Sequence, residues 1–168
     1  MDAPHELRMI DVGDKPVSLR TARATARLRA NEETIRRIAG GRLEKGDALV
    51  AARLAGIMAA KRTSDLVPLC HPLPLDAVEV TLSVCDPTRI LIEAVVRATA
   101  RTGVEMEALA AVAAAALTIY DMSKSIDRGM TIEELRLEEK TGGVRGDYHR
   151  AGSPDWNQRP EAARDGGP

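Results

Sequence analysis

The sequence predicts an α+β fold in which helices cover one face of a four-stranded antiparallel sheet. Four segments carry apolar residues at every second position, the pattern of a strand with one buried face. Three other segments carry apolar residues at helical spacing and are bounded by capping residues or glycines. In chain order these segments read β-α-α-β-β-α-β, and this order is typical of such a sheet.

The first strand and the first helix are expected within residues 20–41. From Arg20 to Ala30 small apolar residues alternate with Arg and Thr, which indicates a strand although alanine prefers helices. Asn31 is a suitable N-cap for the helix that follows, and two acidic residues stand in its first turn. Gly40-Gly41 ends this helix.

The middle of the chain predicts one helix and one hairpin. The helix runs from about Asp47 to Lys61, and Gly56 inside it indicates a close crossing with another element. Residues 76–85 and 89–101 both alternate, and Asp86-Pro87-Thr88 between them is a turn signal. We therefore expect these two runs to pair as a hairpin.

The last part of the chain predicts the longest helix and the final strand. The helix covers Val104 to Ile126, the strand covers Ile132 to Lys140, and Thr141-Gly142-Gly143 ends the strand. Apart from one extra N-terminal helix, the whole order is the split β-α-β arrangement, which is ferredoxin-like. A homodimer or a higher oligomer could cover the sheet face that has no helices.

Composition indicates one cytoplasmic domain. We expect a single domain over residues 9–150, with ends at 1–8 and 151–168 that are rich in Pro, Gly and charge and therefore disordered. A net charge of −1 and the lack of Phe argue against nucleic-acid and membrane partners. Two cysteines without a disulfide spacing, no signal pattern and no charge-free apolar run of about 18 residues favour the cytoplasm.

A proline-rich loop from Lys61 to Leu75 is the first candidate for a functional site. Prolines at positions 68, 72 and 74 keep Cys70 and His71 on a stiff segment that is not helical. Rigid loops that place polar side chains among leucines often build sites. The alternative is a buried connector in which the histidine only satisfies a backbone carbonyl.

The two ends of the longest helix supply further candidates. Glu105 and Glu107 stand at its start, where the helix dipole favours carboxylates, and being two residues apart they cannot both face the core. Asp121 and Lys124 are neighbours at its other end, and the apolar run before Asp121 predicts partial burial and a proton-transfer pair. The fourteen residues from Glu107 to Asp121 span ~21 Å, so a site that uses both ends needs a neighbouring chain.

Cations around the loops suit a phosphorylated small molecule. Lys45 begins the second helix, where backbone N–H groups and a lysine can take an anion. Other basic residues also stand in or near loops: Arg20, Lys61, Arg62, Lys124 and Lys140. Cys70, His71 and Cys85 are too sparse for a structural zinc site.

Several ordered motifs lie between Met9 and Tyr148: Lys45-Gly46-Asp47 and the segments 55–63, 65–73, 102–109 and 116–122. Together they closely resemble the MoaC family, the cyclic pyranopterin monophosphate synthases of molybdenum cofactor biosynthesis. The resemblance implies a ferredoxin-like fold and hexamers built as trimers of dimers, with sites between subunits. It also implies conversion of 3′,8-cyclo-7,8-dihydroguanosine 5′-triphosphate to cyclic pyranopterin monophosphate with release of diphosphate. An upstream radical enzyme would supply this substrate. No cofactor is implied, although a divalent cation such as Mg²⁺ could accompany the triphosphate.

The resemblance also implies the site residues. Catalysis would fall to Lys45, Asp121 and Lys124, with Lys124 as the general acid/base that Asp121 orients. The implied substrate-binding residues are Leu69, Cys70, His71, Glu105, Met106, Glu107, Lys140 and Arg20. The chain departs from the family at Ser123, where cysteine is frequent. It also departs at residues 142–146, where Gly-Gly-Val-Arg-Gly replaces a common Gly-Gly-Lys-Ser-Gly and Arg145 lies one position after the missing lysine.

Two other functions compete with the enzyme. A non-catalytic, oligomeric ferredoxin-like domain could bind a small molecule, since this fold often serves so. Such a binder would need cations but no lysine–carboxylate pair. A metal chaperone that uses Cys70, His71 and Cys85 would contain stoichiometric zinc or copper after purification.

Overall fold

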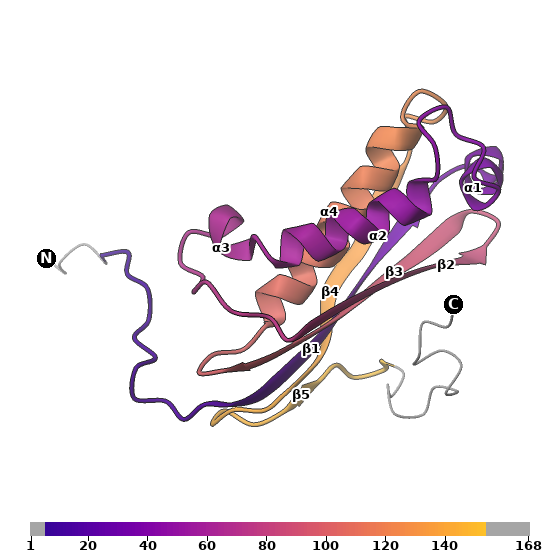
Figure 1. Ribbon diagram of the computed structural model, residues 1–168. Coiled ribbons are helices and arrows are strands. Elements are labelled where there is room, and N and C mark those ends of the chain that lie inside the picture. Colours follow the sequence, from indigo (N-terminus) through magenta and orange to yellow (C-terminus); the bar gives the residue numbers. More distant parts are fainter. Residues whose placement is uncertain (1–5, 154–168) are drawn as a thin grey trace, which may run out of the picture.

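The computed structural model describes residues 6–153, which form one antiparallel sheet with helices on one face (Figure 1). The elements are β1 (Ser18–Arg29), α1 (Glu32–Ala39), α2 (Ala48–Ala60), α3 (Thr63–Leu66), β2 (Ala77–Asp86), β3 (Arg89–Ala100), α4 (Glu105–Ser123), β4 (Thr131–Thr141) and β5 (Tyr148–His149). The strand order is β2-β3-β1-β4-β5. Its first four strands have the ferredoxin-like order, and this confirms the predicted fold class.

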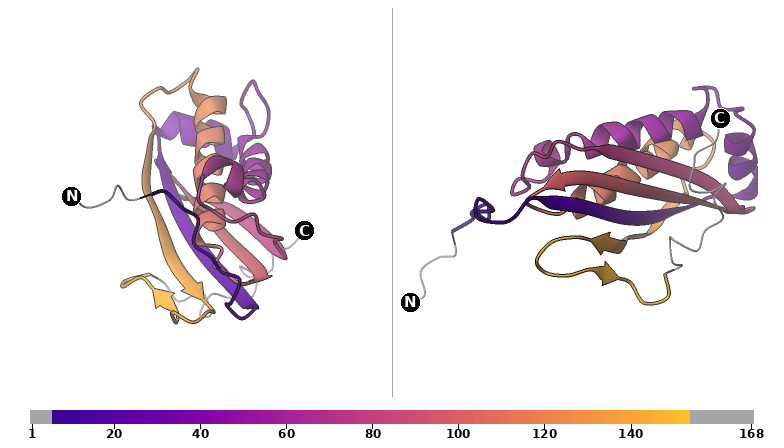
Figure 2. Two further views of the ribbon diagram at one scale, coloured as in Figure 1. Left: turned by 90° about the vertical axis from the view of Figure 1, so that its left-hand side faces the viewer. Right: turned by 60° about the horizontal axis from the view of Figure 1, so that its bottom comes forward.

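The core lies between the sheet and α4, and alanine supplies much of it. The inward residues of β1 and β3 are fully buried: Ala22, Ala24, Ala26, Leu28, Ile90, Ile92, Ala94, Val96 and Ala98. Such short side chains let a helix approach the sheet closely. Among the described residues α4 alone is long and apolar enough to cross a membrane, and it includes the charged residues Glu105, Glu107 and Asp121. Because α4 packs on this sheet face, it is a core helix (Figure 2).

The predicted caps and the helix crossing are confirmed. The Asn31 side chain accepts a hydrogen bond from the Thr34 N–H at 2.8 Å, and Asp47 accepts from Leu49 at 2.9 Å. A Cβ at Gly56 would lie 2.9 Å from the Ala111 carbonyl oxygen. Only a glycine therefore lets α2 pack this closely on α4.

Three features were not predicted from the sequence. The short helix α3 interrupts the proline-rich loop, and the two-residue strand β5 adds a fifth strand beside β4. Strand β4 contains bulges, and Glu134 there has a positive φ of 52°. Elements of two to four residues are too short for a periodic pattern, which explains why α3 and β5 were missed.

The sheet face away from the helices is polar and partly buried. Arg23 is only 3% exposed and contacts Glu93 through Nη1 and Oε2 at 3.1 Å. The Thr25 hydroxyl donates to Glu138 at 2.5 Å, and Ser153 also donates to that carboxylate. Burial raises the pKa of Glu138, but hydrogen bonds from Ser153, Thr25 and Arg136 outweigh it and hold the pKa at about 2. The polar positions of the predicted β1 alternation thus form a network on this face.

The two ends of the chain are only partly described. Residues 6–17 form an extended arm that leaves the end of the sheet (Figure 1). Of the ends expected to be disordered, residues 1–5 and 154–168 lie outside the described residues.

Candidate functional site

A cavity of about 460 Å³ opens at the start of α4. The proline-rich loop contributes one wall, and the first turn of α4 contributes another. Six of the residues predicted to bind substrate line it: Leu69, Cys70, His71, Glu105, Met106 and Glu107. The structure therefore brings together two motifs that are more than thirty residues apart in the sequence.

Glu107 is the buried carboxyl group of this cavity. Its side chain is 4% exposed, whereas the Glu105 side chain is 28% exposed, so only one of the pair faces the interior as predicted. Burial raises the pKa of Glu107, and the charge of Glu105 raises it further against one backbone hydrogen bond. Burial, followed by the charge of Glu107, also raises the pKa of the Cys70 thiol. The cavity thus shifts both groups toward their neutral forms.

A smaller, cationic pocket of about 140 Å³ adjoins the cavity. Lys15, Thr102, Gly103, Glu105 and Arg145 line both. The pocket is also lined by Arg20, Arg101 and Lys140. Lys140 Nζ lies 3.5 Å from Glu105 Oε1. Five cations around one carboxylate make this pocket suitable for a multiply charged anion.

The sequence did not indicate several residues of these two pockets. Arg8, Ile10, Val12 and Lys15 belong to the N-terminal arm, which carries no periodic pattern or motif. Arg101 donates to the Gly13 carbonyl oxygen, and this bond ties the arm to the end of β3. The basic residues Arg8, Lys15 and Arg101 were the only available signal, and scattered charge does not reveal a site.

A second cluster lies at the opposite end of α4. Asp121 pairs with both predicted catalytic lysines, through Oδ2 with Lys45 Nζ at 2.7 Å and through Oδ1 with Lys124 Nζ at 2.7 Å. Lys45 also donates to the Asp121 carbonyl oxygen at 3.2 Å. Hydrogen bonds from Lys124 and Lys45 lower the pKa of Asp121 to about 2. The carboxylate therefore stays ionised and holds two ammonium groups together.

Burial of Asp121 was predicted wrongly, because its side chain is 54% exposed. Of the apolar residues before it, Ile119 is fully buried but Leu117 is exposed, and Asp121 itself points outward with both lysines. A lysine–carboxylate cluster at the surface is open to a bound molecule or to another subunit.

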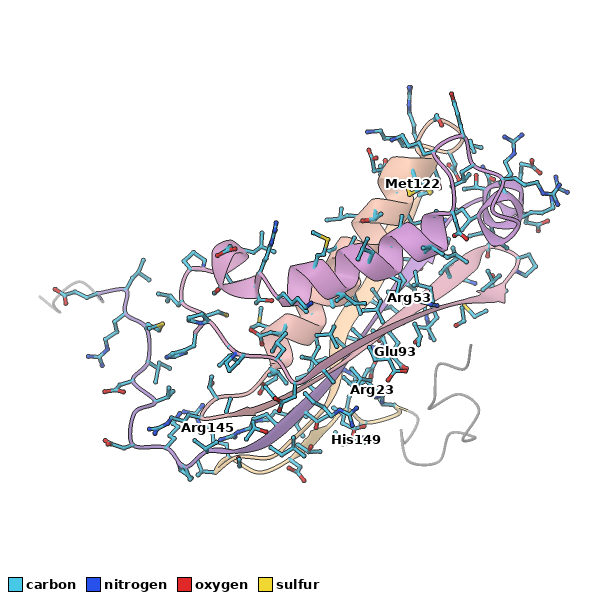
Figure 3. The ribbon with its side chains drawn as sticks, in the orientation of Figure 1. Arg23, Arg53, Glu93, Met122, Arg145 and His149 are labelled. Carbon is cyan, nitrogen blue, oxygen red and sulfur yellow. The ribbon has the colours of Figure 1, made fainter. Side chains whose placement is uncertain are left out.

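The two clusters do not meet within one chain. Met122, next to Asp121, and Arg145 of the cationic pocket lie at opposite ends of the molecule in Figure 3. The three residues considered as metal ligands do not come together either, because Cys85 lines a different pocket from Cys70 and His71. Within residues 6–153 no three His, Cys, Asp or Glu side chains are placed to hold a metal ion.

Comparisons with known proteins agree with these motifs. A model of the MoaC family matches residues 9–143. The chain is 56% identical over 146 residues to cyclic pyranopterin monophosphate synthase 1 of Mycobacterium tuberculosis, covering 87% of this chain and 86% of that protein. It is 51% identical over 156 residues to the cyclic pyranopterin monophosphate synthase of Herpetosiphon aurantiacus, covering 92% and 94%. The cyclic pyranopterin monophosphate synthase of Thermomicrobium roseum is 53% identical over 151 residues, which cover 89% of this chain and 91% of that protein.

Proposed function

Because the chain belongs to the MoaC family, we propose that it is a cyclic pyranopterin monophosphate synthase of molybdenum cofactor biosynthesis. It acts as a cytoplasmic lyase that converts 3′,8-cyclo-7,8-dihydroguanosine 5′-triphosphate to cyclic pyranopterin monophosphate and releases diphosphate. An upstream radical enzyme supplies the substrate, and neither nucleic acid nor a membrane takes part. The observation that carries the proposal is the cavity with its adjoining cationic pocket, which matches a purine-derived ring joined to a triphosphate.

The substrate is divided between the two pockets. The ring system occupies the larger cavity, where His71 and Glu107 can hydrogen-bond its edge and Leu69, Cys70 and Met106 contact its faces. The triphosphate extends into the cationic pocket toward Lys140, Arg101 and Arg145. The reaction uses no resident cofactor in this proposal, and a divalent cation such as Mg²⁺ accompanies the triphosphate.

Proton transfer falls to the cluster at the other end of α4. Opening the purine ring and closing the pyran ring both require protons to move, and lysine can carry them when its surroundings favour the neutral form. Lys124 is the general acid/base, Asp121 orients it, and Lys45 binds or protonates the substrate from the other side of the same carboxylate.

A second copy of the chain must bring the two clusters together. The outer face of α2 exposes Val50, Leu54 and Met58, four residues apart, and the helix that packs against it, α4, exposes Leu117. A two-fold axis through this apolar face sets the α4 helices of two chains side by side in opposite directions. The cavity of one chain then faces the Lys45–Asp121–Lys124 cluster of its partner, and each dimer has two complete sites. A hexamer would be three such dimers.

Loss of the proposed acid/base tests the function. Purified Lys124→Ala should fold as the wild type does yet release diphosphate from the cyclic triphosphate at least about 100-fold more slowly. Arg36→Ala is the matched control, since it removes an exposed cation on α1 that belongs to neither cluster, and should keep full activity. Full activity of Lys124→Ala would contradict the assignment. If the wild type binds the substrate tightly and converts none, the non-catalytic binding domain is correct instead.

A further inference from the structure

Arg20 differs from the other basic residues of the cationic pocket, because it is buried. Its side chain is only 6% exposed, although it lies at the beginning of a strand next to the exposed arm. Its Nε donates to the Ala100 carbonyl oxygen at 3.3 Å and its Nη2 donates to the Arg101 carbonyl oxygen at 3.4 Å. The guanidinium thus binds the main chain where β3 ends and the turn toward α4 begins.

The same guanidinium also packs against the turn that follows β4. A Cβ at Gly143 would overlap Arg20 Nη1, and a Cβ at Gly142 would overlap the Leu19 carbonyl oxygen. Both glycines have positive φ angles, 86° at Gly142 and 94° at Gly143. This turn therefore takes its shape from close contact with β1, and glycine makes the contact sterically possible.

We propose that Arg20 is a positioning residue that joins the two turns carrying the pocket's other cations. One turn carries Arg101 and leads to Glu105, and the other follows Lys140 and carries Arg145. Nε and Nη2 donate to carbonyl groups of the first turn, and the guanidinium packs against Gly143 of the second, so Arg20 sets the spacing of the groups that receive the phosphates. This inference rests on the proposed function and assigns Arg20 to substrate affinity, since the proton-transfer cluster lies at the far end of α4.

Two substitutions disturb this contact from opposite sides. Arg20→Lys keeps the charge but cannot donate to two carbonyl groups from a planar fork. Gly143→Ala keeps Arg20 intact and displaces its guanidinium. Gly146→Ala is the matched control, because Gly146 also has a positive φ, 73°, but a Cβ there meets nothing within 4 Å.

The experiment measures KM, kcat and thermal unfolding for the full-length variants, together with calorimetric binding of inorganic diphosphate. Arg20→Lys and Gly143→Ala should each raise KM and the diphosphate dissociation constant about tenfold, with kcat within about twofold. The double variant should be no worse than either single variant, because both break one contact. Gly146→Ala should leave KM and diphosphate binding unchanged.

Other outcomes overturn the inference. Additive effects in the double variant would mean that Arg20 contacts the phosphates directly. Equal effects of Gly143→Ala and Gly146→Ala on KM would mean that backbone strain in the turn, and not contact with Arg20, weakens binding. A fall in kcat alone would mean that Arg20 acts in the chemical step. Diphosphate binding tests the contact even if the wild type proves inactive, so failure of the proposed function would be recognised separately. If Gly143→Ala does not fold, unchanged KM and diphosphate affinity in Arg20→Lys still contradict the inference.

Discussion

At the scale of single residues, two carboxyl groups of α4 have pKa values shifted in opposite directions. Two lysines hold the pKa of Asp121 at about 2, whereas burial raises the pKa of Glu107. Two carboxyl groups whose pKa values are shifted apart can serve one reaction, one as a fixed negative charge and the other as a proton donor. The proposed dimer would bring such a pair to the same substrate.

Substitution of Glu107 should make the protein more stable at neutral pH. Because its folded pKa lies above the ordinary value of 4.5, the native state binds more protons than the unfolded state just above that pH. The wild type therefore loses stability as pH rises from 4.5 through the folded pKa. Glu107→Gln lacks this loss and should have a higher free energy of unfolding than the wild type at pH 7. The difference in free energy of unfolding between the two proteins should narrow below pH 4.5. Urea unfolding of both proteins from pH 4 to 8 measures it.

The same variant should have lower activity, which separates function from stability. Glu32→Gln is the control, because it removes an exposed carboxylate on α1 that lines neither of the two pockets beside Glu107. A Glu107→Gln protein that is less stable than the wild type at pH 7 would mean that the carboxylate has a stabilising partner.

Residue identities in the site were predictable to different degrees. The motifs singled out four residues through resemblance to a family, and the structure places Lys45 with Asp121 and His71 with Glu107. Their roles in binding and catalysis stay predictions. Arg8 and Lys15 were missed because the arm reaches the cavity only in three dimensions. The exposure of Asp121 was missed because a helical pattern gives the face of a residue only roughly near the helix end.

At the scale of elements, periodicity predicted the long segments and failed for short ones. Strand β1 was recognised despite its alanines because residues 21–30 alternate without a break, and the burial of Ala22, Ala24, Ala26 and Leu28 confirms that alternation. Elements as short as α3 and β5 depend on tertiary contacts: β5 pairs with two residues of β4. Their formation follows from the rest of the fold and not from local sequence.

The crossing of α2 and α4 gives a prediction at this scale. Glycine inside a helix normally costs about 1 kcal/mol relative to alanine, so Gly→Ala usually stabilises. At Gly56 the added methyl group would lie 2.9 Å from the Ala111 carbonyl oxygen and against Val80. Gly56→Ala should therefore lower the free energy of unfolding by about 1–3 kcal/mol, measured by urea denaturation.

An exposed position on the same helix serves as the control. Arg53→Ala should change the free energy of unfolding by less than about 0.5 kcal/mol, because the Arg53 side chain is exposed. Stabilisation by Gly56→Ala would show that the two helices can separate without loss of packing.

At the scale of the whole molecule, the cavity and the Asp121 cluster lie at opposite ends of α4, and we propose that each is half of a site shared between two chains. The apolar face formed by Val50, Leu54 and Met58 of α2 and Leu117 of α4 stays exposed, because no residue within 6–153 covers it. The sequence predicted the separation from helix length alone, and the placement of both clusters agrees with it.

A charge in the middle of this face should separate the subunits. Leu54 is 58% exposed on α2, so Leu54→Glu should leave the fold of the chain intact and desolvate a carboxylate in the dimer. We expect a monomeric mass by light scattering at micromolar concentration, with activity lost at least about tenfold. Glu44→Gln, an exposed change outside this face, should keep the wild-type mass. An active Leu54→Glu monomer would contradict the shared site.

Complementation between two inactive variants tests the shared site most directly. Lys124→Ala and His71→Ala damage opposite half-sites, so co-expression with separate tags should yield heterodimers that each contain one intact site. With random pairing, half of the dimers are mixed and the preparation should recover about a quarter of wild-type diphosphate release. Lys124→Ala co-expressed with Lys45→Ala damages the same half-site twice and should stay inactive. If the first mixture also stays inactive although mixed dimers are isolated, the two clusters do not form one site between subunits.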